Sequence, residues 1–81
     1  MFKVGNKVKI LKEYGANPHP VKKVGMIVSK RKTVLGKYFC VEFDQYIDGH
    51  SGDGSGKVGC CWWFPGDCIE IVDPQLEFNF D

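Results

Sequence analysis

Alternation of apolar and polar residues is clearest in the segment KYFCVEFD, residues 37–44. Phe39, Val41 and Phe43 occupy every second position there, which is the period of a strand with one buried face. Shorter runs that favour strands occur at residues 8–14, 24–30, 58–64 and 68–72. Helical periodicity is nearly absent, so the pattern predicts an all-β chain of five short strands.

Glycine and proline residues mark the connections between these strands. Residues 15–23 contain Pro18 and Pro20, which exclude a central strand or a helix. Residues 31–37 predict a hairpin tip with Gly36 in the turn. The segment QYIDGHSGDGSGK, residues 45–57, holds four glycines and predicts a long loop before the fourth strand. We expect one domain over residues 1–72, followed by a short acidic tail at 73–81.

Five short strands with one long loop predict a small, partly open barrel. The segment WWFPGDCIEIV resembles the end of SH3-like barrels, where a strand passes through a single helical turn into the closing strand. The opening FKVGNKVKI resembles the first strand of KOW-type SH3-like modules. The resemblance implies a five-stranded SH3-like fold.

Charge is divided unevenly along the chain, although the net charge is +1. Residues 1–37 carry ten Lys/Arg and one acid, whereas residues 38–81 carry nine acids and one lysine. Two interpretations stay open. Opposite charges meet across neighbouring strands, or a basic face and an acidic face serve different partners.

Metal-ligating residue types gather around the long loop and the strand after it. Zinc takes four Cys, His, Asp or Glu ligands, and the candidates are His50, Asp53, Cys60 and Cys61. Consecutive residues of a regular strand face opposite ways, so both cysteines could ligate one ion only at an irregular strand start. Gly59 makes a bulge plausible there. Zinc is the predicted cofactor.

The alternative is that the cysteines are ordinary core residues, because free cysteine behaves as a small hydrophobe. This interpretation suits Cys68 best, next to Ile69, although neither Cys68 nor Cys40 is excluded as a ligand. If Phe39 and Val41 face the core, Cys40 faces outward. Cys40 and Cys61 would then lie side by side across a strand pair.

Several function classes are disfavoured. There is no nucleophile elbow, P-loop or paired-glutamate arrangement, so we expect no enzyme. The loop lacks the acid spacing of an EF-hand calcium site. No apolar run is long enough to span a membrane, and MFKVGNKVKI reads as a strand and not as a signal peptide. A cytoplasmic protein with reduced cysteines is therefore expected.

Two kinds of macromolecular partner can be argued from the residues. An exposed tryptophan beside the loop, Trp63, would anchor a protein partner, and the acids Asp44, Asp48 and Glu70 of the second half are further candidate contacts. The alternative is a nucleic-acid-binding small barrel that uses the lysine-rich first half, including Lys30, Arg31 and Lys32.

The run IDGHSGDGSGKVGCCWWFP resembles a pattern in small proteins of bacteriophages and mobile elements of Gram-positive bacteria. Position 60 is commonly histidine in that pattern, so Cys60 would be a substitute ligand. The whole chain is similar in size and style to phage-encoded anti-CRISPR proteins. The resemblance implies a zinc-binding protein in the cytoplasm of an infected bacterium. Such a protein would inhibit a type II CRISPR effector nuclease by blocking target DNA loading.

Overall fold

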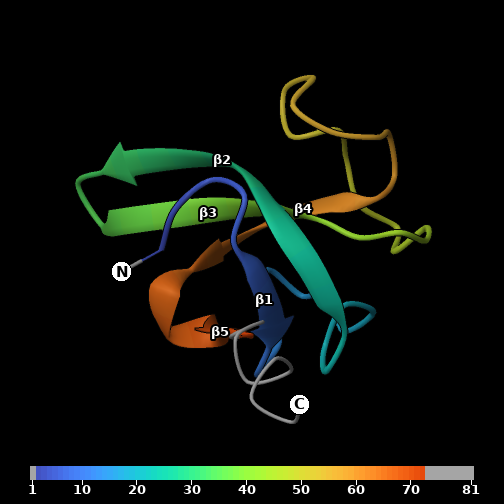
Figure 1. Ribbon diagram of the computed structural model, residues 1–81, viewed down its shortest axis with the longest axis horizontal. Helices are drawn as coiled ribbons and strands as arrows, with labels where there is room; N and C mark the ends of the chain where they lie inside the picture. Colours follow the sequence, from blue (N-terminus) through green and yellow to red (C-terminus); the bar gives the residue numbers. More distant parts are fainter. Residues whose placement is uncertain (1, 73–81) are drawn as a thin grey trace, which may run out of the picture.

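The computed structural model describes residues 2–72. Its strands are β1 (Lys7–Ile10), β2 (Val24–Thr33), β3 (Gly36–Glu42), β4 (Cys61–Pro65) and β5 (Ile69–Ile71) (Figure 1). A 3₁₀ turn, η1 (Gly66–Cys68), joins β4 to β5. The strands form one antiparallel sheet in the order β4-β3-β2-β1-β5.

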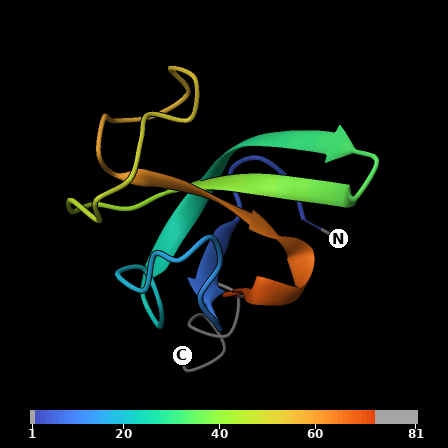
Figure 2. The ribbon, with the colours of Figure 1, turned by 180° about the vertical axis from the view of Figure 1, so that it is seen from behind.

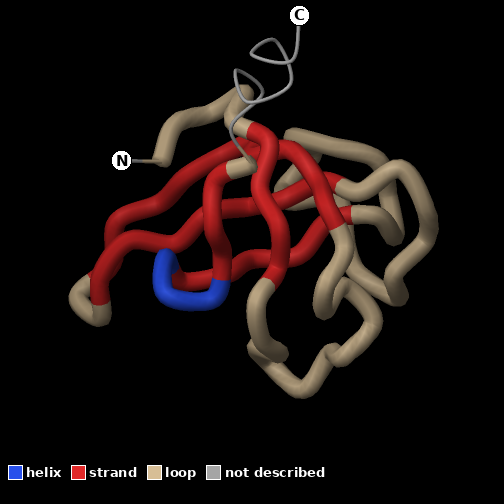
Figure 3. The backbone as a smooth tube through the Cα atoms, turned by 60° about the horizontal axis from the view of Figure 1, so that its bottom comes forward, coloured by secondary structure: helices blue, strands red, loops and turns tan. Residues whose placement is uncertain are grey.

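The predicted all-β, five-stranded fold is confirmed. The sheet curls so that its two edge strands, β4 and β5, are joined by η1 without pairing to each other, as the view from behind shows (Figure 2). The sheet is therefore partly open. The helical turn between the last two strands, expected from the SH3-like resemblance, is present (Figure 3).

The core forms inside this curl from the alternating apolar residues. In β1, Val8 and Ile10 are buried, whereas Lys7 and Lys9 are exposed. The cluster comprises Val8, Ile10, Ile27, Phe39, Val41, Phe43, Ile47, Phe64, Cys68 and Ile69. Cys68 belongs to this cluster, which supports its interpretation as a small apolar core residue.

Most strand boundaries differ from the sequence prediction by one or more residues. The first strand ends at Ile10 and not at residue 14, and Leu11 N–H donates to the carbonyl of Cys68. The hairpin strands continue to Thr33 and from Gly36, so the tip is only two residues long. The fourth strand begins at Cys61 because Gly59 has φ +82° and Cys60 N–H closes a turn onto Lys57.

The expectation that Cys40 faces outward into solvent is wrong. Phe39, Cys40 and Val41 are all buried, because the glycine-rich loop, residues 45–57, covers the second face of β3. A Cβ atom at Gly52 would lie 2.5 Å from the Cys40 Sγ. The loop thus acts as a second layer over one end of the sheet.

A bulge in β2 changes which side chains face inward. Ile27 lies opposite Val41, and the next pair is Ser29 with Cys40, so Val28 is an extra residue. Beyond the bulge, Lys30 pairs with Phe39 and therefore shares its face of the sheet. Without the bulge, Ser29 would continue the face of Ile27.

The buried side chain of Asn17 fastens the long connection between β1 and β2. Its Nδ2 donates to the carbonyl of Ile47 at 3.0 Å, and its Oδ1 accepts from the N–H of His19 at 3.1 Å. The connection is therefore tied to the residues after β3.

The predicted acidic tail, residues 73–81, lies outside the described residues. Within residues 2–72, no helix has the length and apolar character needed to cross a membrane.

Matched valines test the core. We expect Val41→Ala, at a fully buried position, to lower the free energy of unfolding by about 2 kcal/mol, because two buried methyl groups are lost. Val34→Ala, at the fully exposed hairpin tip, should change it by less than about 0.5 kcal/mol. Urea unfolding measures both, and equal losses would contradict this core assignment.

Candidate functional site

The predicted ligand His50 is held by contacts within the protein. Its backbone exchanges two hydrogen bonds with Cys61, at 2.9 and 3.0 Å, in an isolated bridge. Its Nδ1 accepts from the N–H of Gly52 at 2.8 Å, and its ring stacks on Trp62 with centroids 5.4 Å apart. His50 thereby shapes the start of the loop, with one ring nitrogen already occupied.

Asp53, a second predicted ligand, forms an ion pair. Its Oδ2 accepts from the Arg31 guanidinium at 2.7 Å, and Arg31 lies over the Trp63 ring at 4.8 Å from the centroid. Both partners of the ion pair are largely exposed, so the pair is worth less than about 1 kcal/mol. The contact joins the tip of the glycine-rich loop to β2 and covers part of Trp63.

Cys40 and Cys61 lie beneath the loop. Cys61 is a diagonal neighbour of Cys40 across the β3–β4 pair, and the two thiols are within hydrogen-bonding reach, as the sequence predicted. Burial and, second to it, the neighbouring Cys61 together raise the pKa of the Cys40 thiol to about 12. Burial also raises the pKa of the Cys61 thiol. Both are therefore protonated thiols at neutral pH.

These residues do not fit a zinc ion. Among residues 2–72, no three His, Cys, Asp or Glu side chains are arranged to hold a metal. Asp53 is paired with Arg31, and His50 is stacked on Trp62. His50, Asp53, Cys60 and Cys61 are thus brought to one region but not to one point. Zinc stays a prediction that this geometry does not support.

Glycines explain how the loop closes over the thiols. A Cβ atom at Gly52 or at Gly56 would lie 2.5 Å from the Sγ of Cys40 or of Cys61, respectively. Lys57 N–H, at the end of the loop, donates to the Glu42 carboxylate at 2.7 Å. Close backbone approach to the two thiols accounts for glycine at both positions.

The predicted partner-binding residues come from different elements of the fold. Trp63 is half-buried under Arg31, whereas Asp44 and Asp48 are exposed after β3. Glu70 lies on β5, at the other edge of the sheet, opposite Lys9 on β1 (Figure 1).

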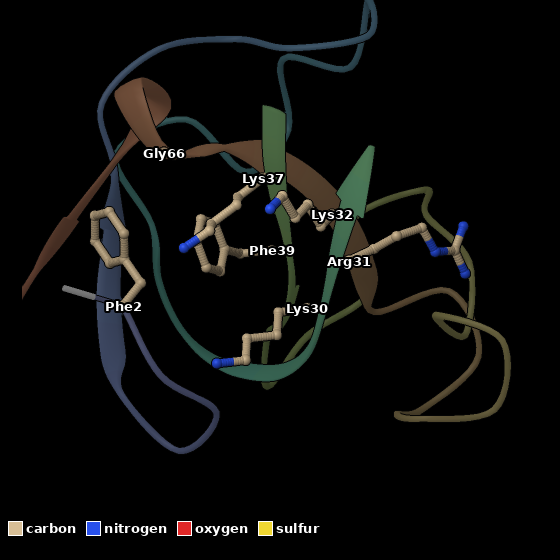
Figure 4. Close-up of a pocket in the computed structure, with 7 residues that line it drawn as sticks. All are labelled: Phe2, Lys30, Arg31, Lys32, Lys37, Phe39 and Gly66. Atoms are coloured by element: carbon tan, nitrogen blue, oxygen red, sulfur yellow. The ribbon is translucent and has the colours of Figure 1, made fainter. Parts of the chain in front are cut away.

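A pocket of about 620 Å³ lies elsewhere, on the inner face of the β2–β3 hairpin. We call it the basic pocket. It is lined by Phe2, Lys30, Arg31, Lys32, Lys37, Phe39 and Gly66. Figure 4 shows the lysine side chains around the two phenylalanine rings, with Arg31 extending away from them. The Arg31 guanidinium is instead held by Asp53.

Three lysines therefore supply the charge of the basic pocket. Lys32 and Lys37 stand directly opposite each other in the β2–β3 register, an arrangement of like charges that destabilises a strand pair. In the described part of the chain, neither these two nor Lys30 forms an ion pair with a carboxylate. A bound anion would relieve this repulsion.

Sequence reasoning noted Lys30 and Lys32 but missed Lys37, Phe2, Phe39 and Gly66 as parts of a site. The bulge that turns the lysines inward carries no clear signal in the sequence, and Phe39 was assigned to the core. The excess of lysine and arginine in the first half was the one indication of a basic site.

Comparisons with protein-family models, curated proteins and solved structures find no match for this chain.

Two loop glycines with positive φ test the covering of the thiols. Gly52→Ala places a Cβ against Cys40, whereas nothing lies within 4 Å of a Cβ at Gly54. We expect Gly52→Ala to lower the free energy of unfolding by about 1–3 kcal/mol more than Gly54→Ala. It should also speed the reaction of Cys40 with a thiol reagent in the folded protein. Equal effects of the two substitutions would contradict the close approach.

The raised pKa of Cys40 predicts a pH dependence. The unfolded thiol loses its proton near pH 9.0 and the folded one near 12, so deprotonation favours the unfolded state between these values. The difference in free energy of unfolding between the wild type and Cys40→Ala should be constant below pH 9.0. It should shift against the wild type as the pH rises. Urea unfolding from pH 8 to about 11 measures it, and a constant difference would show that the pKa is not raised.

Proposed function

We propose that this protein is a non-enzymatic nucleic-acid-binding module that contacts phosphates with the lysines of the basic pocket. The observation that carries the proposal is the position of Lys30, Lys32 and Lys37 around an apolar floor. Nucleic-acid sites combine lysine or arginine contacts to phosphates with aromatic side chains for the bases. The basic pocket has both.

Charge distribution supports this choice over an acidic contact face. Four of the seven acids in residues 2–72 already have partners within the protein: Glu42, Asp48, Asp53 and Asp67. Of the others, Asp44 follows β3 and Glu70 lies on β5. The lysines of the basic pocket, in contrast, are gathered at one place without carboxylate partners among the described residues.

Inhibition of a CRISPR effector nuclease stays a prediction from resemblance alone. The acids of the second half are compatible with it, but Asp48 follows β3 and Glu70 lies on β5, and they give it less support than the lysines of the basic pocket give to nucleic-acid binding.

Charge-neutralising variants test nucleic-acid binding. We expect the combined variant Lys30→Gln, Lys32→Gln, Lys37→Gln to weaken binding of a fluorescent oligonucleotide. It should lower the salt slope of log K by about 2, because each phosphate contact to a single strand contributes about 0.7. Anisotropy titrations at several salt concentrations measure the slope.

The matched control changes three exposed lysines outside the pocket by the same charge: Lys7→Gln, Lys9→Gln and Lys22→Gln. It should keep most of the affinity. If both triple variants lose the same affinity, binding depends on net charge and the basic pocket is not the site.

A further inference from the structure

The floor of the basic pocket is aromatic and partly open. Phe2 and Phe39 form a tilted pair with ring centroids 5.1 Å apart and an interplanar angle of 59°. Phe39 is buried and Phe2 is half-buried. Phe2 therefore offers the accessible ring, and Phe39 supports it from the core side.

Gly66 keeps this aromatic surface accessible. A Cβ atom there would lie 3.4 Å from Phe2 Cε2 and 3.7 Å from Phe39 Cε2, in van der Waals contact with both rings. Gly66 has no positive φ that would require glycine. A larger side chain at this position would therefore occupy the pocket without straining the backbone.

Pocket size and charge position indicate the kind of ligand. A volume of about 620 Å³ lies within the range of pockets that enclose small organic molecules, about 300–1,000 Å³. The apolar floor suits a flat ring, and lysines on β2 and β3 surround it. A duplex keeps its bases stacked and paired, so it could reach the lysines but not fill the floor. An unpaired strand can turn a base inward.

We propose that the basic pocket binds single-stranded nucleic acid by inserting one base against Phe2 while Lys30, Lys32 and Lys37 hold the adjoining phosphates. This inference rests on the proposed function and adds the strand type and the role of the aromatic floor. Lys32 and Lys37, opposite each other on neighbouring strands, would share the negative charge of the backbone.

Gly66→Leu is the direct test, because it fills the pocket and leaves every charge in place. The probes are oligothymidylate and oligouridylate of about 15 nucleotides, close to the largest site sizes of small barrels. We expect Gly66→Leu to weaken binding of at least one of these about 5- to 150-fold, the equivalent of 1–3 kcal/mol of stacking per base. The salt slope should stay that of the wild type, since no phosphate contact is removed.

Two comparisons isolate the base from the backbone. An oligonucleotide of the same length with abasic sites throughout should bind the wild type and Gly66→Leu equally, because there is no base to insert. A duplex of the same length should also be insensitive to Gly66→Leu. Phe2→Leu, which keeps apolar volume but removes the ring, serves as the second variant and should weaken only the single strands that carry bases. Urea unfolding establishes that each variant is folded before it is titrated.

Outcomes for the two proposals can be told apart. If the lysine variant loses binding and Gly66→Leu binds single strands as the wild type does, nucleic-acid binding stands and base insertion is overturned. If neither variant changes binding, both proposals fail. Binding to phosphatidylserine vesicles that exceeds oligonucleotide binding, and that is lost when the exposed tip residues Val34 and Leu35 are changed to serine, would identify a membrane surface instead and overturn base insertion.

Discussion

Alternation along β2 and β3 is the constraint on which the arrangement of both faces depends. A strand sends successive side chains to opposite sides, so one extra residue reverses the assignment of all that follow. The bulge after Ile27 is such an extra residue. It keeps Ile27 in the core and turns Lys30 and Lys32 to the same side, at the point where the core ends. The same reversal sends Arg31 to the opposite face, where it reaches Trp63 and Asp53.

Within residues 2–72 no α-helix covers the second face of the sheet, so another segment must do so. The glycine-rich loop fulfils this role by approaching Cys40 and Cys61 with bare backbone. The small, weakly polar thiols accept such contact, whereas a larger side chain on the loop would hold it away from the sheet. Close packing between loop backbone and thiols therefore accounts for both the glycines and the cysteines at these positions.

Much of the fold could be predicted, because apolar alternation in a short chain leaves few arrangements that bury one face of every strand. Burial of Cys40 could not be predicted. Alternation of apolar residues indicates which face of β3 packs on the core, but not that the glycine-rich loop covers the other face. The metal prediction relied on residue types, which do not show whether the side chains meet at one point. In the structure Asp53 pairs with Arg31, and His50 stacks on Trp62. The basic pocket was not predicted because it joins Phe2, Gly66 and the hairpin, which are distant in sequence. The side of the sheet on which its β2 lysines lie also depends on a bulge that the sequence does not signal.

A near-neutral net charge argues against an anion-binding site only if acidic and basic side chains are evenly interspersed over the surface. In this molecule the lysines of the basic pocket are grouped, and several acids are held elsewhere. Asp53 is used to hold Arg31, Glu42 to hold the end of the loop, and Asp67 lies 3.5 Å from Lys12. Each of these acids is engaged away from the inner face of the hairpin, where Lys32 and Lys37 oppose each other. A repulsive pair of this kind lowers the stability of the strands that carry it. Its position beside the half-buried ring of Phe2 supports the proposed ligand, an unpaired nucleotide, which brings both negative charge and a flat apolar surface.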